Sequence, residues 1–280
     1  MIIHSLKARR IFAELASLDE DLLPLDRAAL AIGLDAYPDL DIDSYLKRLD
    51  ILAVRTEVLA GRERSAENIL QSLNEVLFIQ EGLRGNNEDY YDPRNSYLNE
   101  VLDRKTGIPI SLSIIYMEVA RRIGFPIQGV GLPGHFILKC WSADLELYID
   151  AFDQGKTLSM KDCQEFLDRN YGGTLTVQPI LLQAMDKKAI LSRMLFNLKG
   201  IYYQKEQFDE ALAVIEKILL LNPGLSTEIR DRGLLYMQTS LFAKALADLE
   251  FYMKSTAAPE DGPSIKKHIE TLRSVVGSPN

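Results

Sequence analysis

The last third of the chain repeats itself with a period of 34 residues. Shifting the sequence by this interval superimposes aromatic and alanine positions, placing Tyr202 on Tyr236, Phe208 on Phe242 and Ala211 on Ala245. A period of this length is typical of stacked helical hairpins, in which small residues let two helices approach closely. The repeat therefore predicts helical hairpins for residues 186–280.

The period and its Tyr, Phe and Ala positions resemble the tetratricopeptide repeat. Two repeats are fewer than the roughly three that such arrays usually need. Either helices at residues 180–192 and 264–275 complete the array, or the array docks on the rest of the protein. The resemblance implies a concave peptide-binding surface, with Tyr202 and Tyr236 as its candidate residues. The alternative is a helical cap that only buries core.

Composition limits the kind of partner. The 280 residues are 47% hydrophobic and 26% charged, with a net charge of −8, and no part has a marked basic excess. We therefore expect no nucleic-acid partner. The apolar runs are shorter than a bilayer requires, and no signal peptide is recognised at the start, so we expect no membrane association.

Cysteine and histidine are scarce. The chain has two cysteines and three histidines, all far apart in sequence. This number favours neither a disulfide scaffold nor a metal site, and it fits a reducing compartment. We expect a cytoplasmic protein without metal or other cofactor, and the sequence leaves its oligomeric state open.

The pattern of apolar residues changes along the chain. Residues 1–85 show helical spacing, and an apolar helix is expected at about 111–123, ending at Gly124. After Gly124 the period becomes two, which predicts strands at 126–131 and 135–151. The predicted fold is α+β and predominantly helical, with a helical part at 1–85, a core with a small antiparallel sheet at 86–185, and helical repeats at 186–280.

The second of these strand segments predicts a hairpin. With Ser142-Ala143 at the tip, one face is apolar, and the other brings Lys139 beside Glu146 and His135 beside Asp150. The apolar pairs in this register are Phe136 with Ile149, Leu138 with Leu147, and Cys140 with Leu145.

A carboxylate beside an imidazole fixes the tautomer of the ring and supports its charged form. The pair of His135 and Asp150 is thus the base and the orienting group of a nucleophilic triad. A purely structural hydrogen bond is the alternative.

The order of a helix, a strand with His and a strand with Asp resembles the transglutaminase-like, papain-type fold. The run Arg121-Arg122-Ile123-Gly124-Phe125-Pro126 resembles the segment that follows the helix in that fold. Further strings resemble the SirB1 family, namely Asn95-Ser96-Tyr97-Leu98, Gly107-Ile108-Pro109-Ile110-Ser111-Leu112 and Pro133-Gly134-His135-Phe136. This resemblance implies helical N-terminal residues, a transglutaminase-like core, C-terminal tetratricopeptide-like helices, and a regulatory role in bacteria.

The sequence departs from this resemblance at the nucleophile. The transglutaminase Cys position falls on Pro109, and the nearest hydroxyl belongs to Ser111. Cys140 is expected on the buried face of the hairpin. Cys163 is expected near the start of a later helix, where a thiol pKa can be lowered, but at the wrong position in the chain. Candidate cleft-lining residues are Asn95, Asn99, Pro109 and Gly134.

Three functions follow as hypotheses. The leading one is a catalytically degenerate transglutaminase-like protein that binds a protein or peptide. The second is a hydrolase or acyltransferase on peptide or amide bonds, with Ser111 as nucleophile, His135 as base and Asp150 as orienting group. It requires the Ser111 hydroxyl about 3 Å from a His135 nitrogen, whereas a hydroxyl that caps its own helix contradicts it. The third is a helical scaffold whose His–Asp pair is structural.

Overall fold

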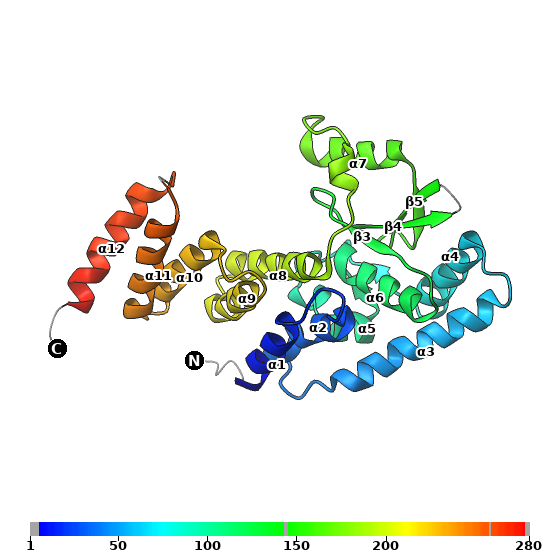
Figure 1. The fold of residues 1–280 in the computed structure, drawn as a ribbon, viewed down its shortest axis with the longest axis horizontal. Coiled ribbons are helices and arrows are strands. Elements are labelled where there is room, and N and C mark those ends of the chain that lie inside the picture. The colour runs from blue at the N-terminus through cyan, green and yellow to red at the C-terminus, as the bar shows by residue number, and fades with distance from the viewer. Residues whose placement is uncertain (1–5, 143–144, 258, 278–280) are drawn as a thin grey trace. The chain divides into compact units, whose positions relative to one another are not determined.

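The computed structural model describes residues 6–142, 145–257 and 259–277. The chain forms two compact units, one of residues 18–194 and one that combines residues 195–280 with the N-terminal residues up to Ser17. The predicted α+β class, predominantly helical with a small antiparallel sheet, is confirmed (Figure 1). Among the described helices, none is both long and apolar enough to cross a bilayer. Division into three parts at residues 85 and 185 stays a prediction.

Among its described residues, the unit of residues 18–194 contains six complete α-helices, four short helical turns and six strands. The helices are α2 (Leu25–Ile32), α3 (Ile42–Ala60), α4 (Ala66–Asn74), α5 (Leu98–Arg104), α6 (Pro109–Arg122) and α7 (Met160–Tyr171). The turns are η1 (Gly33–Asp35), the π-helical η2 (Glu75–Gln80), η3 (Pro93–Asn95) and η4 (Pro179–Leu182). The strands are β1 (Arg84–Gly85), β2 (Thr106–Gly107), β3 (Gln128–Val130), β4 (Ile137–Ser142), β5 (Leu145–Asp150) and β6 (Lys156–Leu158).

The helix ends follow from local chemistry. Ser65 caps α4 by accepting a hydrogen bond from the Asn68 amide. Asp41 caps α3, because its carboxylate accepts a hydrogen bond from the Ser44 amide. The helix α6 begins at Pro109, where the missing amide hydrogen costs nothing.

The central sheet has four antiparallel strands in the order β3-β4-β5-β6. Helix α6 packs against β3 and β4. On the other side, Cys163 of α7 joins a buried apolar cluster with Val130, Ile137 and Tyr148. The sheet therefore lies between α6 and α7, which cover its two faces.

The predicted hairpin exists, but its register was wrong by two residues. Leu138 pairs with Ile149 and Cys140 with Leu147, because Ser142 extends the ladder by pairing with Leu145. The predicted tip residue Ala143 lies outside the described residues. A shift of two residues keeps every side chain on its predicted face, since side chains alternate along a strand.

Two strand pairings escaped prediction. The strand β6 pairs with β5, and a parallel pair joins β1 to β2 just before α6. The strand β6 has three residues, and β1 and β2 have two each, so these strands are too short to show an alternation of apolar and polar residues in the sequence.

The C-terminal repeats form the predicted helical hairpins. The helices are α8 (Lys187–Gln204), which begins within the larger unit, α9 (Phe208–Leu221), α10 (Ser226–Gln238), α11 (Phe242–Ser255) and α12 (Gly262–Val276), and the N-terminal α1 (Leu6–Ala16) packs on α9. Helices α10 and α11 pack so closely that a side chain larger than that of Gly233 would not fit, because a Cβ there would lie 2.8 Å from a Leu249 methyl.

The two repeat tyrosines do not form a binding surface. Tyr202 is 5% exposed and Tyr236 is 7% exposed, so the prediction of a surface at these residues was wrong. Both rings fill space within the helical array, which is the usual position of a large residue repeated once per hairpin.

Candidate functional site at the His135–Asp150 pair

The structure brings His135 and Asp150 together. His135 Nε2 lies 2.8 Å from Asp150 Oδ2, although His135 precedes β4 and Asp150 ends β5. The other carboxylate oxygen of Asp150 accepts hydrogen bonds from the backbone amides of Phe152, at 2.9 Å, and Asp153, at 3.4 Å. The turn after β5 thus fixes the carboxylate, and the carboxylate fixes the ring.

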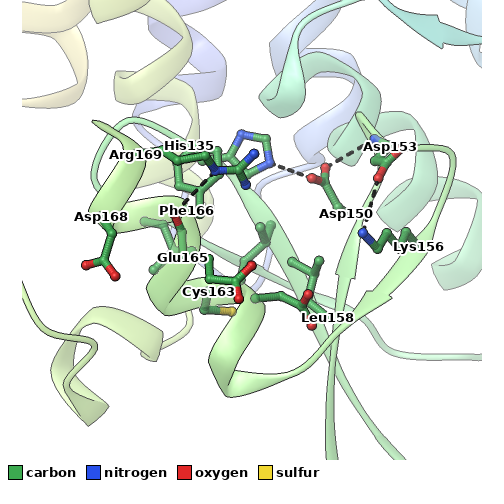
Figure 2. Close-up of a pocket in the computed structure, with 13 residues that line it drawn as sticks. His135, Asp150, Asp153, Lys156, Leu158, Cys163, Glu165, Phe166, Asp168 and Arg169 are labelled. Atoms are coloured by element: carbon green, nitrogen blue, oxygen red, sulfur yellow. Dashed lines mark hydrogen bonds and ion pairs between the residues drawn. The ribbon is translucent and has the colours of Figure 1, made fainter. Parts of the chain in front are cut away.

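Aromatic contacts hold the imidazole from two sides. The Phe166 ring of α7 stacks on it with 4.4 Å between centroids (Figure 2). The Phe152 ring meets it edge-on, with 6.3 Å between centroids. His135 is only 7% exposed, and no described residue hydrogen-bonds to its second ring nitrogen, Nδ1. This nitrogen can therefore accept a proton or hydrogen-bond to a ligand.

A half-buried arginine positions the loop that carries His135. Arg193 Nη2 donates to the carbonyl oxygens of Leu132, at 2.7 Å, and His135, at 2.6 Å. Burial lowers the pKa of Arg193 from its ordinary value. Its two carbonyl contacts fix both ends of the turn around Gly134, whose φ of +73° suits glycine.

The pair opens onto a cavity of about 470 Å³. Residues before β4, at the β5–β6 turn and on α7 line it: Leu132, His135, Ile137, Asp150, Asp153, Lys156, Leu158, Asp162, Cys163, Glu165, Phe166, Asp168 and Arg169. Figure 2 shows the side chains of α7 facing those of the β5–β6 turn. Among the described residues, no group of His, Cys, Asp or Glu is arranged to hold a metal ion.

Ser111 does not line this cavity. It is fully buried in the first turn of α6, where its hydroxyl donates to the Asn95 carbonyl oxygen at 2.7 Å and accepts from the Ile108 amide at 3.1 Å. This is the capping role that the sequence left as the alternative to catalysis. The structure therefore assembles His135 with Asp150 and leaves Ser111 apart.

We expect Ser111→Ala to cost about 1–3 kcal/mol of unfolding free energy, because it leaves a buried carbonyl and a buried amide unpaired. Urea denaturation measures this, with Ser17→Ala on the exposed end of α1 as the matched serine control. A variant as stable as the wild type would contradict the capping role.

Neither cysteine has the properties of a nucleophile. Cys163 lines the cavity, but burial, together with the nearby charges of Asp162 and Asp150, raises the pKa of its thiol to about 11. The expectation that a helix start would lower this pKa was wrong, because desolvation and negative neighbours outweigh the helix dipole. Cys140 is buried as predicted, and burial raises its pKa to about 11.

The remaining cleft candidates lie elsewhere. Asn95 is buried in a hydrogen-bonded network, and Pro109 is buried in the first turn of α6. Asn99 lines a separate depression between the α2–α3 connection and α5, and Gly134 is exposed in its turn. The prediction that these residues line the His–Asp cleft was wrong. A short sequence motif can reflect the packing of α5 and α6 instead of a functional site.

Most of the cavity lining lies outside any sequence motif. Asp153 and Lys156 follow β5, and Glu165 and Phe166 lie on α7. Arg193, which holds the loop of His135 but does not line the cavity, carries no motif either. The capping pair Ser159 and Asp162 identifies the start of α7, but nothing in the sequence says that α7 covers the sheet beside His135.

Comparison with known families agrees with this geometry. Residues 43–196, more than half of the chain, match the model of the transglutaminase-like superfamily. The chain belongs to the transglutaminase-like superfamily. Residues 198–270 match the tetratricopeptide repeat, a module that generally mediates protein–protein interaction.

Full-length relatives of this transglutaminase-like protein share both parts. A UPF0162 protein from Xylella fastidiosa (strain Temecula1) is 36% identical over 268 residues, which cover 94% of this chain and 94% of the relative. A UPF0162 protein from Vibrio cholerae is 27% identical over 91% of this chain and 94% of the relative. These relatives confirm the predicted SirB1-type family.

A similarity also extends to a eukaryotic protein. F-box only protein 21 from Pongo abelii is 32% identical over 213 residues, which are 73% of this chain and 31% of that protein. The similar segment therefore makes up about a third of that longer protein.

Proposed function

We propose that this transglutaminase-like protein binds a protein or peptide at the His135–Asp150 cavity without forming a covalent intermediate. The observation that carries the proposal is the state of Ser111, whose hydroxyl is fully buried and hydrogen-bonded to the Asn95 carbonyl oxygen. A serine nucleophile must instead give its proton to the base.

The cavity retains the means to bind. Asp150 holds Nε2 of His135, so that Nδ1 is left as one fixed polar atom on a largely buried ring. A preorganised group of this kind hydrogen-bonds a ligand without first losing conformational freedom. The tetratricopeptide match supports a protein partner.

The expected setting is the cytoplasm, without a nucleic-acid or membrane partner. Both described cysteines are free and buried, and the net charge of −8 disfavours phosphate groups.

Covalent probes test the proposal. After incubation with a fluorophosphonate at pH 7.5, intact-mass spectrometry should show no adduct on the native protein, since a buried, hydrogen-bonded hydroxyl is not activated. Iodoacetamide should modify neither cysteine in the native protein and both after unfolding in urea, because the reactive form is the thiolate.

A stoichiometric fluorophosphonate adduct on Ser111 that disappears in His135→Gln would overturn the proposal. It would establish the alternative, a hydrolase or acyltransferase that uses Ser111, His135 and Asp150. The retained 2.8 Å contact between His135 and Asp150 is what favours that alternative.

A further inference from the structure

The cavity beside His135 carries an excess of negative charge. Five carboxylates line it, against two permanently cationic side chains, Lys156 and Arg169. Lys156 lies 3.7 Å from Asp153, and Lys161, outside the cavity, lies 3.4 Å from Glu165, so two of the five carboxylates have a lysine partner. Hydrogen bonds from Ser159 lower the pKa of Asp162, so that this group stays ionised at neutral pH.

These carboxylates come from two facing walls. Glu165 and Asp168 are on α7, while Asp150 and Asp153 are at the end of β5 and in the turn after it (Figure 2). Glu165 and Asp168 are exposed, so they can meet an incoming charge without a desolvation cost of their own. A cation between the walls would approach negative groups from both sides.

The cavity also has apolar and aromatic surface. Leu132, Ile137 and Leu158 line it, together with Phe166, which stacks on His135. His135 is more than nine-tenths buried, and its Nδ1 has no partner among the described residues. The lining thus offers carboxylates to a cationic head, hydrocarbon to a methylene chain, and one polar atom to a peptide group.

We propose that the cavity takes a lysine or arginine side chain from a segment of a partner protein. A volume of about 470 Å³ holds one such side chain with its backbone. The proposal rests on the binding function above and specifies the ligand for the same site.

Binding of short peptides to the full chain tests this. The probe is acetyl-Gly-Gly-Lys-Gly-Gly-amide, with the arginine peptide beside it and the norleucine and glutamate peptides as controls. Histidine ring resonances report binding by NMR, and His135→Gln assigns the signal of His135 among the three histidines. The lysine or arginine peptide should shift this signal saturably, more weakly as salt rises, and the control peptides should not.

Charge reversal on α7 supplies the matched variants. Glu165→Lys with Asp168→Lys should weaken binding of the cationic peptide at least about tenfold. Glu63→Lys with Glu67→Lys, an exposed pair outside the cavity with the same change in net charge, should leave binding nearly unchanged. Equal weakening by both pairs, or equal binding of the lysine and norleucine peptides, would overturn the proposal.

The two proposals fail separately. If a neutral or acidic peptide shifts the His135 signal instead, the ligand class is wrong and the binding function stands. If the cationic peptide binds and is then cleaved or transferred, as its mass would reveal, the ligand class stands and the non-catalytic function fails.

Discussion

Replacing Lys217 with methionine is expected to remove a steep pH dependence of stability. Relative to the wild type, the free energy of unfolding of the variant should fall by up to about 4 kcal/mol between pH 7 and 10.5. Lys217 on α9 is 4% exposed, and its ammonium lies 6.0 Å from the centre of the Phe12 ring of α1. Burial lowers the pKa of Lys217 from 10.5 to about 7. Each unit of this change costs about 1.4 kcal/mol, and methionine keeps most of the side-chain volume without the charge.

The pH dependence has a definite sign. Between about pH 7 and 10.5 the unfolded chain holds a proton on Lys217 that the folded chain has lost. Unfolding therefore takes up a proton, and wild-type stability rises with pH by up to about 1.4 kcal/mol per unit across this window. The stability of Lys217→Met relative to the wild type should accordingly fall as the pH rises.

Urea denaturation followed by circular dichroism at pH 7.5, 8.5 and 9.5 measures the effect. Lys266→Met, on the exposed side of α12, is the matched control and should change stability by less than about 0.5 kcal/mol. A difference between Lys217→Met and wild type that stays constant with pH would show that burial does not lower this pKa.

Replacing Asn95 with alanine is expected to cost about 3–5 kcal/mol of unfolding free energy. The Asn95 amide oxygen accepts hydrogen bonds from Asn86 Nδ2 and Arg104 Nη1, and its amide nitrogen donates to the carbonyl oxygens of Asp89 and Tyr90. Alanine leaves the buried Asn86 amide without its acceptor, at about 1–3 kcal/mol, and removes three part-buried hydrogen bonds worth about 0.5–1.5 kcal/mol each.

Denaturation at pH 7 with Asn170→Ala as control measures this loss. Asn170 is exposed on α7 and makes one hydrogen bond, to the Phe166 carbonyl oxygen, so its removal should matter little. If Asn95→Ala is as stable as the wild type, Asn95 does not hold the loop of residues 86–95, and a functional role for it would regain support.

Together, Asn95 and Ser111 give a structural reason for two of the strings that identify the family. The Asn95 side chain holds the loop before α5, and its backbone carbonyl oxygen accepts the hydrogen bond that places Ser111 at the start of α6. His135 and Asp150 lie in a different network, supported by Arg193 and the turn after β5. Asn95 and Ser111 therefore stabilise the fold, whereas His135 and Asp150 belong to the cavity.

Sequence alone determined the features that depend on local periodicity. The 34-residue repeat predicted the hairpins α9 to α11, because each hairpin must bury the same helix faces. Alternation along β4 and β5 predicted which side chains share a face, and so placed His135 beside Asp150 despite a register error of two residues.

Only the tertiary structure decided what surrounds the pair. The burial of Ser111, the raised pKa of Cys163 and the acidic lining all depend on how α6 and α7 pack against the sheet. Residues such as Glu165 and Asp153 come together across distant segments, and no local spacing encodes such a contact. Burial and charge in a site are properties of its packed neighbours, so the sequence could name the His–Asp pair but not its environment.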